Sequence, residues 1–87
     1  MNISFPLESA SYDARARSVT FPAMVDGRSR RCLVTEEALT DHFGAVSPEP
    51  EQLRSAFESN RDEILEVAEY RFRTGAAGDV LLRTQDF

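Results

Sequence analysis

The chain has 87 residues, a formal net charge of −5 at neutral pH and a pI of about 4.8. A chain of this length is expected to form one domain, residues 1–87. No apolar run approaches the roughly 20 residues needed to cross a bilayer, and the first ten residues lack the basic and apolar regions of a secretory signal. The single cysteine, Cys32, excludes an intramolecular disulfide. We therefore expect a cytoplasmic protein without membrane association.

The N-terminal residues alternate in hydrophobicity, which places Ile3, Phe5 and Leu7 on one side of an extended chain. This alternation predicts a short strand. Pro6 restricts the strand to an edge or an end of a sheet, because proline has no backbone N–H. The following residues, 8–17, are polar and are expected to form a loop.

Residues 18–34 give the clearest element, a β-hairpin closed by Asp26 and Gly27. An Asp-Gly pair is typical of a two-residue type I′ turn, in which both central residues have positive φ. Such a turn fixes the register, with the pairs Val25–Arg28, Ala23–Arg30, Phe21–Cys32 and Val19–Val34. This register gathers the apolar residues on one face, in agreement with the hydrophobic alternation. The other face is expected to be largely solvated and carries Ser18, Thr20, Pro22, Arg31 and Leu33.

Two helical segments follow the hairpin. Residues 35–44 predict a short helix that is capped by Thr35 and ended by Gly44. Residues 47–75 predict one long helix, capped by Ser47, with an apolar stripe at helical spacing formed by Leu53, Phe57, Ile64, Val67 and Ala68. Residues 79–84 predict a last strand, with Val80 and Leu82 on one face.

Together these elements predict an α+β fold with two layers. We expect a small antiparallel sheet of three to four strands, with the hairpin of residues 18–34 at its centre. A short and a long helix are expected to pack on one face of this sheet. Only such an arrangement buries all the apolar stripes together.

Four stretches of the sequence resemble a known family. They are ISF near the start, VTFPAMVDGRSRRCLVTEEALTDHFGA, FESNRDEILEVAEYRF and the closing DVLLRTQDF. Over nearly its whole length the chain is similar to the bacterial domain of unknown function 1488 family. The resemblance implies a small bacterial protein with one α+β domain, and it carries over no cofactor and no catalytic residue.

The residues needed for nucleophilic catalysis are scarce in this chain. A cysteine–histidine pair would require Cys32 and His42 in one cleft. The hairpin register points Cys32 into the core, where a thiol acts as a small hydrophobe. His42 falls in the last turn of the short helix, where a cation complements the helix dipole. We therefore expect no enzymatic activity and no cofactor.

A row of acids shares one face of the long helix at spacings of three and four: Glu58, Asp62, Glu66 and Glu69. Two of them could chelate a hard cation weakly, but no spacing in the chain resembles a zinc or EF-hand site. We expect no bound metal. The row is interpreted as a solvated surface or as a docking surface for a basic partner.

The basic residues are ten arginines and no lysine, a composition typical of a GC-rich bacterial genome. Residues 1–35 carry a net charge of +2, and residues 36–87 carry −7. In the hairpin, Arg28 and Arg30 share one face and Arg31 points to the other. A weak nucleic-acid-associated regulator using these arginines is one alternative, but the acidic pI and the lack of interleaved aromatics argue against it. The other interpretation is that the positive hairpin meets an acidic helix, in the same chain or in a second copy.

Two polar residues interrupt the apolar side of the long helix, Asn60 at the centre of the stripe and Arg71 near its end. We expect Asn60 to be hydrogen-bonded to backbone and Arg71 to extend past the edge of the sheet. The alternative is a polar site near Asn60 and Arg71, adjoined by Arg61, that binds a small molecule. Tyr70 lies off the stripe and is expected to be exposed, as aromatics at interfaces are.

The sequence therefore favours a non-enzymatic protein-interaction or regulatory domain. Its expected partner is a protein, either a second copy of the chain in a homodimer or another protein. The candidate interaction residues are Arg28, Arg30, Arg31, Asn60, Arg61, Tyr70 and Arg71.

Overall fold

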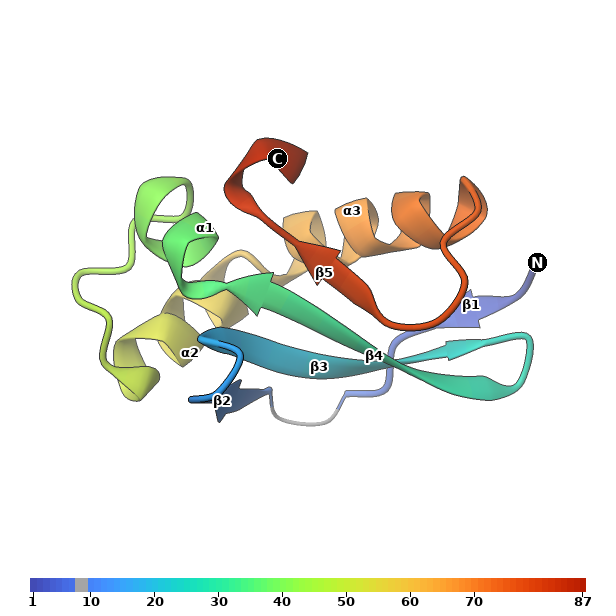
Figure 1. Ribbon diagram of the computed structural model, residues 1–87, viewed down its shortest axis with the longest axis horizontal. Coiled ribbons are helices and arrows are strands. Elements are labelled where there is room, and N and C mark those ends of the chain that lie inside the picture. The colour runs from blue at the N-terminus through green and yellow to red at the C-terminus, as the bar shows by residue number, and fades with distance from the viewer. Residues whose placement is uncertain (8–9) are drawn as a thin grey trace.

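The computed structural model describes residues 1–7 and 10–87 (Figure 1). The described residues form five strands, three α-helices and one short 3-10 helix. In chain order these are β1 (Ile3–Ser4), β2 (Ser11–Asp13), β3 (Ser18–Val25), β4 (Arg28–Thr35), α1 (Glu36–Asp41), α2 (Pro50–Ser59), α3 (Arg61–Arg73), β5 (Val80–Leu82) and η1 (Thr84–Asp86). None of the helices in the described part of the chain is both long and apolar enough to cross a membrane.

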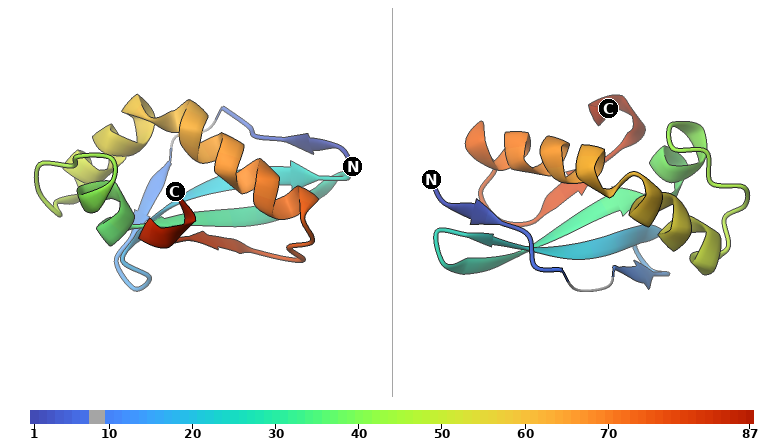
Figure 2. Two further views of the ribbon diagram at one scale, coloured as in Figure 1. Left: turned by 90° about the horizontal axis from the view of Figure 1, so that it is seen from above. Right: turned by 180° about the vertical axis from the view of Figure 1, so that it is seen from behind.

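The protein has two layers, with the helices on one face of a single sheet (Figures 1 and 2). The sheet runs in the order β1-β3-β4-β5, and β2 pairs with the same edge of β3 as β1 does. The predicted α+β two-layer fold is confirmed. In detail the sheet has one strand more than expected, because residues 11–13 form β2 rather than part of a loop.

The β3–β4 hairpin has the register that its turn predicts. Asp26 and Gly27 have φ values of 53° and 81°, as a type I′ turn requires, and Phe21 pairs with Cys32. In this register Pro22 occupies a pair that is not hydrogen-bonded, so its missing N–H removes no bond from the ladder. Pro22 also lies in the gap on the β3 edge between the residues paired with β1 and those paired with β2.

The open face of the sheet is less solvated than expected at two positions. Ser18 is buried, and its hydroxyl donates a 2.9 Å hydrogen bond to the carbonyl oxygen of Ala16. Leu33 is also buried, and it is paired with Leu81 of β5. The expectation failed there because the tight turn before β3 and the pairing of β4 with β5 shield these two side chains.

Strand β5 runs parallel to β4, with Cys32 opposite Val80 and Val34 opposite Leu82. The sheet is therefore mostly antiparallel rather than wholly antiparallel as expected. The whole helical layer lies between the two strands in sequence, and a crossover of this length allows the chain to return in the same direction. Val80 and Leu82 share the buried face, as predicted.

The predicted long helix is two helices that meet at Asn60. This residue ends α2 and precedes α3, with φ −121° and ψ 23°, outside the helical range. Its side-chain Nδ2 donates a 2.9 Å hydrogen bond to the carbonyl oxygen of Ala56. The side-chain amide thus bonds a carbonyl oxygen that a backbone N–H would bond in a continuous helix. Because asparagine side chains compete with the backbone in this way, asparagine frequently ends a helix.

The N-cap residue predicted from the sequence is correct for α1 and wrong for α2. Thr35 caps α1, and its hydroxyl accepts a 3.1 Å hydrogen bond from the N–H of Ala38. Ser47 does not cap α2, which begins at Pro50 after the capping residue Glu49. Proline favours the first position of a helix because its fixed φ is already helical and no hydrogen bond is lost there.

The core lies between the sheet and the helices. Most of the predicted apolar stripe is buried, while Val67 is only partly buried and packs against the edge of the core. The ring of Phe57 lies 5.0 Å, centroid to centroid, from that of Phe21 on β3, which joins the two layers. The large side chains that are fully buried include Phe57, Phe72, Leu39, Leu53, Ile64, Leu82, Val19, Val34 and Val80.

Candidate interaction site

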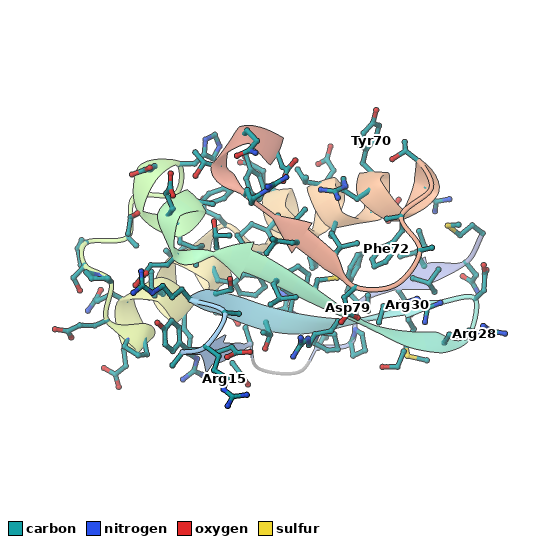
Figure 3. The ribbon with its side chains drawn as sticks, in the orientation of Figure 1. Arg15, Arg28, Arg30, Tyr70, Phe72 and Asp79 are labelled. Atoms are coloured by element: carbon teal, nitrogen blue, oxygen red, sulfur yellow. The ribbon has the colours of Figure 1, made fainter. Side chains whose placement is uncertain are left out.

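Arg28 and Arg30 project from one face of β4, next to the hairpin turn (Figure 3). Arg28 is exposed and Arg30 is half-buried. The Nη1 atom of Arg30 donates a 3.3 Å hydrogen bond to the carbonyl oxygen of Ser29. Among the described residues, neither guanidinium has a carboxylate within ion-pair distance. The two cations therefore remain available to an external acid.

The two arginines line a cleft of about 460 Å³ at the hairpin end of the molecule. We call it the arginine cleft, and its lining residues are Met1, Val25, Asp26, Arg28, Arg30, Ala76 and Ala77. The Asp26 carboxylate is not within ion-pair distance of either arginine. Its Oδ1 instead accepts a 2.8 Å hydrogen bond from the N–H of Asn2. The cleft is thus cationic, with small apolar side chains on its helical side.

Arg31 lies on the opposite, open face of the sheet and is already paired. Its Nη1 is 4.0 Å from Oδ2 of Asp13, and its Nε is 3.7 Å from Oδ2 of Asp79. Oδ1 of Asp79 also accepts a 3.1 Å hydrogen bond from the N–H of Arg31. The structure therefore separates Arg31 from Arg28 and Arg30, as the register implied, and holds it between two carboxylates.

Arg61 is held inside the fold near the helix junction. Its guanidinium carbon lies 5.4 Å from the centroid of the Phe57 ring, and its Nη1 is 3.3 Å from a carboxylate oxygen of Glu58. Its Nη2 also donates a 3.3 Å hydrogen bond to the carbonyl oxygen of Pro6. Arg61 therefore fastens the N-terminal segment to the helical layer.

Arg71 lies at the other end of α3, over the edge strand β5. Its Nη1 donates a 3.3 Å hydrogen bond to the carbonyl oxygen of Leu81 and lies 3.5 Å from Oδ2 of Asp86. The arginine thus covers a backbone carbonyl of an edge strand, and edge strands are places where exposed backbone groups favour aggregation. Tyr70, beside it, is exposed, as expected.

Asn60 and Arg71, which the alternative prediction placed near one polar site, lie at opposite ends of α3. The two residues are eleven positions apart, which corresponds to roughly 16 Å along a helix. A hollow of about 300 Å³ at the helix junction is lined by Asn60 and Arg61, and Arg71 is not part of it. Each polar group instead has its own backbone partner, Ala56 for Asn60 and Leu81 for Arg71.

Cys32 and His42 have separate surroundings. Burial, with a smaller contribution from the nearby Asp79 carboxylate, raises the pKa of the Cys32 thiol from 9.0 to about 12. Nε2 of His42 lies 3.2 Å from Oε2 of Glu63, and the imidazole ring stacks on Phe87. In the described part of the chain, no group of three or more histidine, cysteine or acidic residues is placed to hold a metal ion.

The burial of Cys32 predicts a thiol that reacts slowly in the native protein. We expect its modification by Ellman's reagent at pH 8 to be at least about 1,000-fold slower than in denaturant, because the reagent reaches the thiol only in the rare unfolded molecules. Stopped-flow absorbance measures both rates. Comparable rates would show that β4 opens without global unfolding.

The same burial predicts a loss of stability at high pH. The folded state holds the thiol proton up to about pH 12, whereas the unfolded thiol loses it near pH 9.0, so the stabilisation is complete below pH 9 and declines above it. We expect the urea midpoint to fall more between pH 8 and pH 10.5 for the wild type than for Cys32→Ala. Equal decreases for the two proteins would contradict the raised pKa.

A second cleft lies along α3, and the sequence indicated only some of its lining residues. It has a volume of about 250 Å³, and we call it the acidic cleft; its lining residues are Phe5, Asp62, Leu65, Glu66 and Glu69. The shared face of the three acids is evident from their helical spacing. The part played by Phe5 was not evident, because it depends on how the N-terminal segment packs against α3.

Comparison with known proteins found one family. Residues 3–82 match the family described as protein of unknown function (DUF1488). A crystal structure of a DUF1488 protein of unknown function from Shewanella loihica PV-4 is similar to the chain, with 28% sequence identity, a TM-score of 0.81 and coverage of 94% of each chain. No curated protein matches the sequence.

Proposed function

The chain belongs to the DUF1488 family of proteins of unknown function, and within that family we propose that it is a bacterial, cytoplasmic protein-interaction domain without enzymatic activity. We propose further that the arginine cleft binds an acidic surface of a protein partner. The bacterial relative with the same fold supports the proposed bacterial origin. The raised pKa of Cys32 makes its thiol a poor nucleophile, which supports the proposed lack of enzymatic activity.

The observation that carries this proposal is the unpaired state of Arg28 and Arg30. Within the described residues, Arg31, Arg61, Arg71 and Arg73 each have an acidic partner within 4.0 Å. The other six arginines have none in this part of the chain, and of these six only Arg28 and Arg30 line the arginine cleft. The chain carries fifteen acids against ten arginines, so acids are not in short supply. Arg28 and Arg30 share one strand face and one cleft, and neither has a carboxylate partner. They therefore form a surface that can bind an external anion.

The geometry of the cleft suits carboxylates presented by a protein. Each guanidinium can hold a carboxylate through two parallel hydrogen bonds. The two arginines are two positions apart on a strand, so their Cα atoms are separated by roughly 6.6 Å. Met1, Ala76 and Ala77 add apolar contact area next to the charges. An acidic segment with a small apolar side chain would satisfy both parts of this surface.

Nucleic acid is a less suitable occupant. Binding to a phosphate backbone requires several cations, and Arg31, the third arginine of the hairpin, is held by two carboxylates. No aromatic side chain lines the arginine cleft to stack on a base. The net charge of −5 also repels a polyanion at long range.

We expect an acidic peptide to bind and its affinity to depend on the two arginines. A fluorescein-labelled peptide of alternating glutamate and alanine is titrated with the protein in 20 mM salt, and anisotropy reports binding. The R28E/R30E variant is expected to bind at least about tenfold more weakly, which corresponds to about 1.4 kcal/mol. A single-stranded oligonucleotide of equal charge serves as the competing probe.

A matched control separates the cleft from the overall charge. The R15E/R54E variant undergoes the same change in net charge, but both residues are exposed and lie outside the arginine cleft. It should bind the peptide within about threefold of the wild type. Equal losses in the two variants would reject the cleft as the site, and tighter binding of the oligonucleotide than of the peptide would favour the nucleic-acid alternative.

A further inference from the structure

The acidic cleft contains two carboxylates that complement the arginine cleft. Asp62 and Glu66 are exposed on α3, and among the described residues neither has a cation within ion-pair distance. Glu69, in the same cleft, is held by Nε of Arg73 at 3.1 Å. Phe5 and Leu65 are partly buried and line the same cleft. The chain therefore has one cleft with two unpaired arginines and a second cleft with two unpaired acids.

The two pairs of charges match in spacing. Asp62 and Glu66 are four positions apart on a helix, so they share one face and their Cα atoms are roughly 6 Å apart. The Cα atoms of Arg28 and Arg30, two positions apart on a strand, are roughly 6.6 Å apart. A strand face and a helix face with these spacings can form two ion pairs at the same time, one for each arginine.

The two clefts are neighbours on the surface. Met1 lines the arginine cleft and Phe5 lines the acidic cleft, and the extended segment that includes β1 joins them over roughly 13 Å. Ile3 of β1 pairs with Val25, directly before the hairpin turn. Figures 1 and 2 show β1 at the hairpin end of the sheet, on the side on which α3 runs. Both clefts therefore lie along the β1 edge of the molecule.

Building on the proposed function, we propose that the occupant of the arginine cleft is the acidic cleft of a second copy of this chain, in a two-fold symmetric dimer. Because the clefts are adjacent, one two-fold axis near β1 brings each arginine cleft onto the partner's acidic cleft. The contact then forms twice and closes on itself. A single contact repeated head to tail would instead produce open chains of molecules.

The dimer is expected to be weak and sensitive to salt. Exposed ion pairs contribute little each, and charges further apart than a Debye length of about 8 Å are screened at physiological salt. Light scattering coupled to size-exclusion chromatography, at several hundred micromolar protein and 50 mM salt, should give a mass that approaches twice 9.8 kDa. Raising the salt to 500 mM should shift the mass towards that of the monomer.

Charge reversal tests the pairing directly. R28E/R30E and D62R/E66R are each expected to be monomeric, because each places like charges opposite one another in both contacts. The combined variant R28E/R30E/D62R/E66R restores both contacts with reversed polarity and should form the dimer again. Two reversals of each sign cancel, so its net charge equals that of the wild type.

The matched control combines R28E/R30E with E37R/E51R. Glu37 and Glu51 are exposed acids in the first turns of α1 and α2, outside the acidic cleft. This variant also has the wild-type net charge, but its reversed arginine cleft has no reversed partner, so it should remain monomeric. Thermal melting of all variants identifies any that fail to fold, and the comparison is made among the folded ones.

Each outcome has a distinct meaning. A wild-type monomer at all concentrations in 50 mM salt overturns the dimer, and so does a combined variant that stays monomeric while folded. Masses that grow beyond the dimer with concentration also overturn the two-fold arrangement. If the wild type is monomeric but the acidic peptide still binds in a manner that requires Arg28 and Arg30, the proposed function stands and only the identity of the partner is wrong.

Discussion

We expect the Phe57→Ala variant to lose most of its free energy of unfolding at room temperature. The Phe57 side chain is fully buried and joins the α2 helix to Phe21 on β3. Replacing a buried phenylalanine by alanine removes about 3–5 kcal/mol from the free energy of unfolding. A domain of this size has a free energy of unfolding near the lower end of the range of about 5–15 kcal/mol, so the loss approaches the whole margin.

Urea denaturation followed by circular dichroism measures this effect. Tyr70→Ala is the matched control, because it also removes an aromatic ring from a helix but from a side chain that is 66% exposed. It should change the free energy of unfolding by no more than about 0.5 kcal/mol. A Phe57→Ala variant that unfolds at a urea concentration close to that of Tyr70→Ala would show that α2 does not anchor the core.

The hairpin could be predicted in detail because its determinants are local. Asp26 and Gly27 specify a turn with a fixed number of residues, and this turn sets every pair along β3 and β4. The hydrophobic alternation of both strands agrees with that register, and a shift by one residue would destroy the agreement. The burial of Cys32 followed directly from it.

Other parts of the fold depend on contacts that the sequence pattern does not display. The apolar stripe keeps its phase across Asn60, so the pattern alone predicts one helix where there are two. Strand β2 is short and polar, and it exists because β3 offers it an edge beyond the reach of β1. The parallel direction of β5 follows from the path of the whole helical layer, which no short segment specifies.

The candidate site likewise combines features that the sequence predicts with features that it does not. The register separated Arg31 from Arg28 and Arg30, and helical spacing grouped Asp62 with Glu66. The clefts in which these charges lie could not be predicted, because their other walls come from distant parts of the chain. Ala76 and Ala77 carry no chemical signal of their own, and only the return of the chain from α3 to β5 brings them to the hairpin.

We expect Leu82→Ala to lower the free energy of unfolding by about 2–5 kcal/mol, whereas Leu81→Ala should lower it by less than about 1 kcal/mol. The two residues are adjacent in β5 and chemically identical. Leu82 is fully buried opposite Val34, whereas Leu81 is 43% exposed on the open face. Urea denaturation of both variants therefore isolates the effect of the face on which the side chain lies.

The comparison also tests the register of the parallel pair. Because side chains alternate across a strand, a shift of β5 by one residue would bury Leu81 and expose Leu82. The two variants would then exchange their effects, and equal effects would indicate a segment that is not fixed as a strand. Only the observed pairing, with Cys32 opposite Val80 and Val34 opposite Leu82, predicts a large loss for Leu82 alone. It is this pairing that closes the core on the side of the sheet opposite to β1.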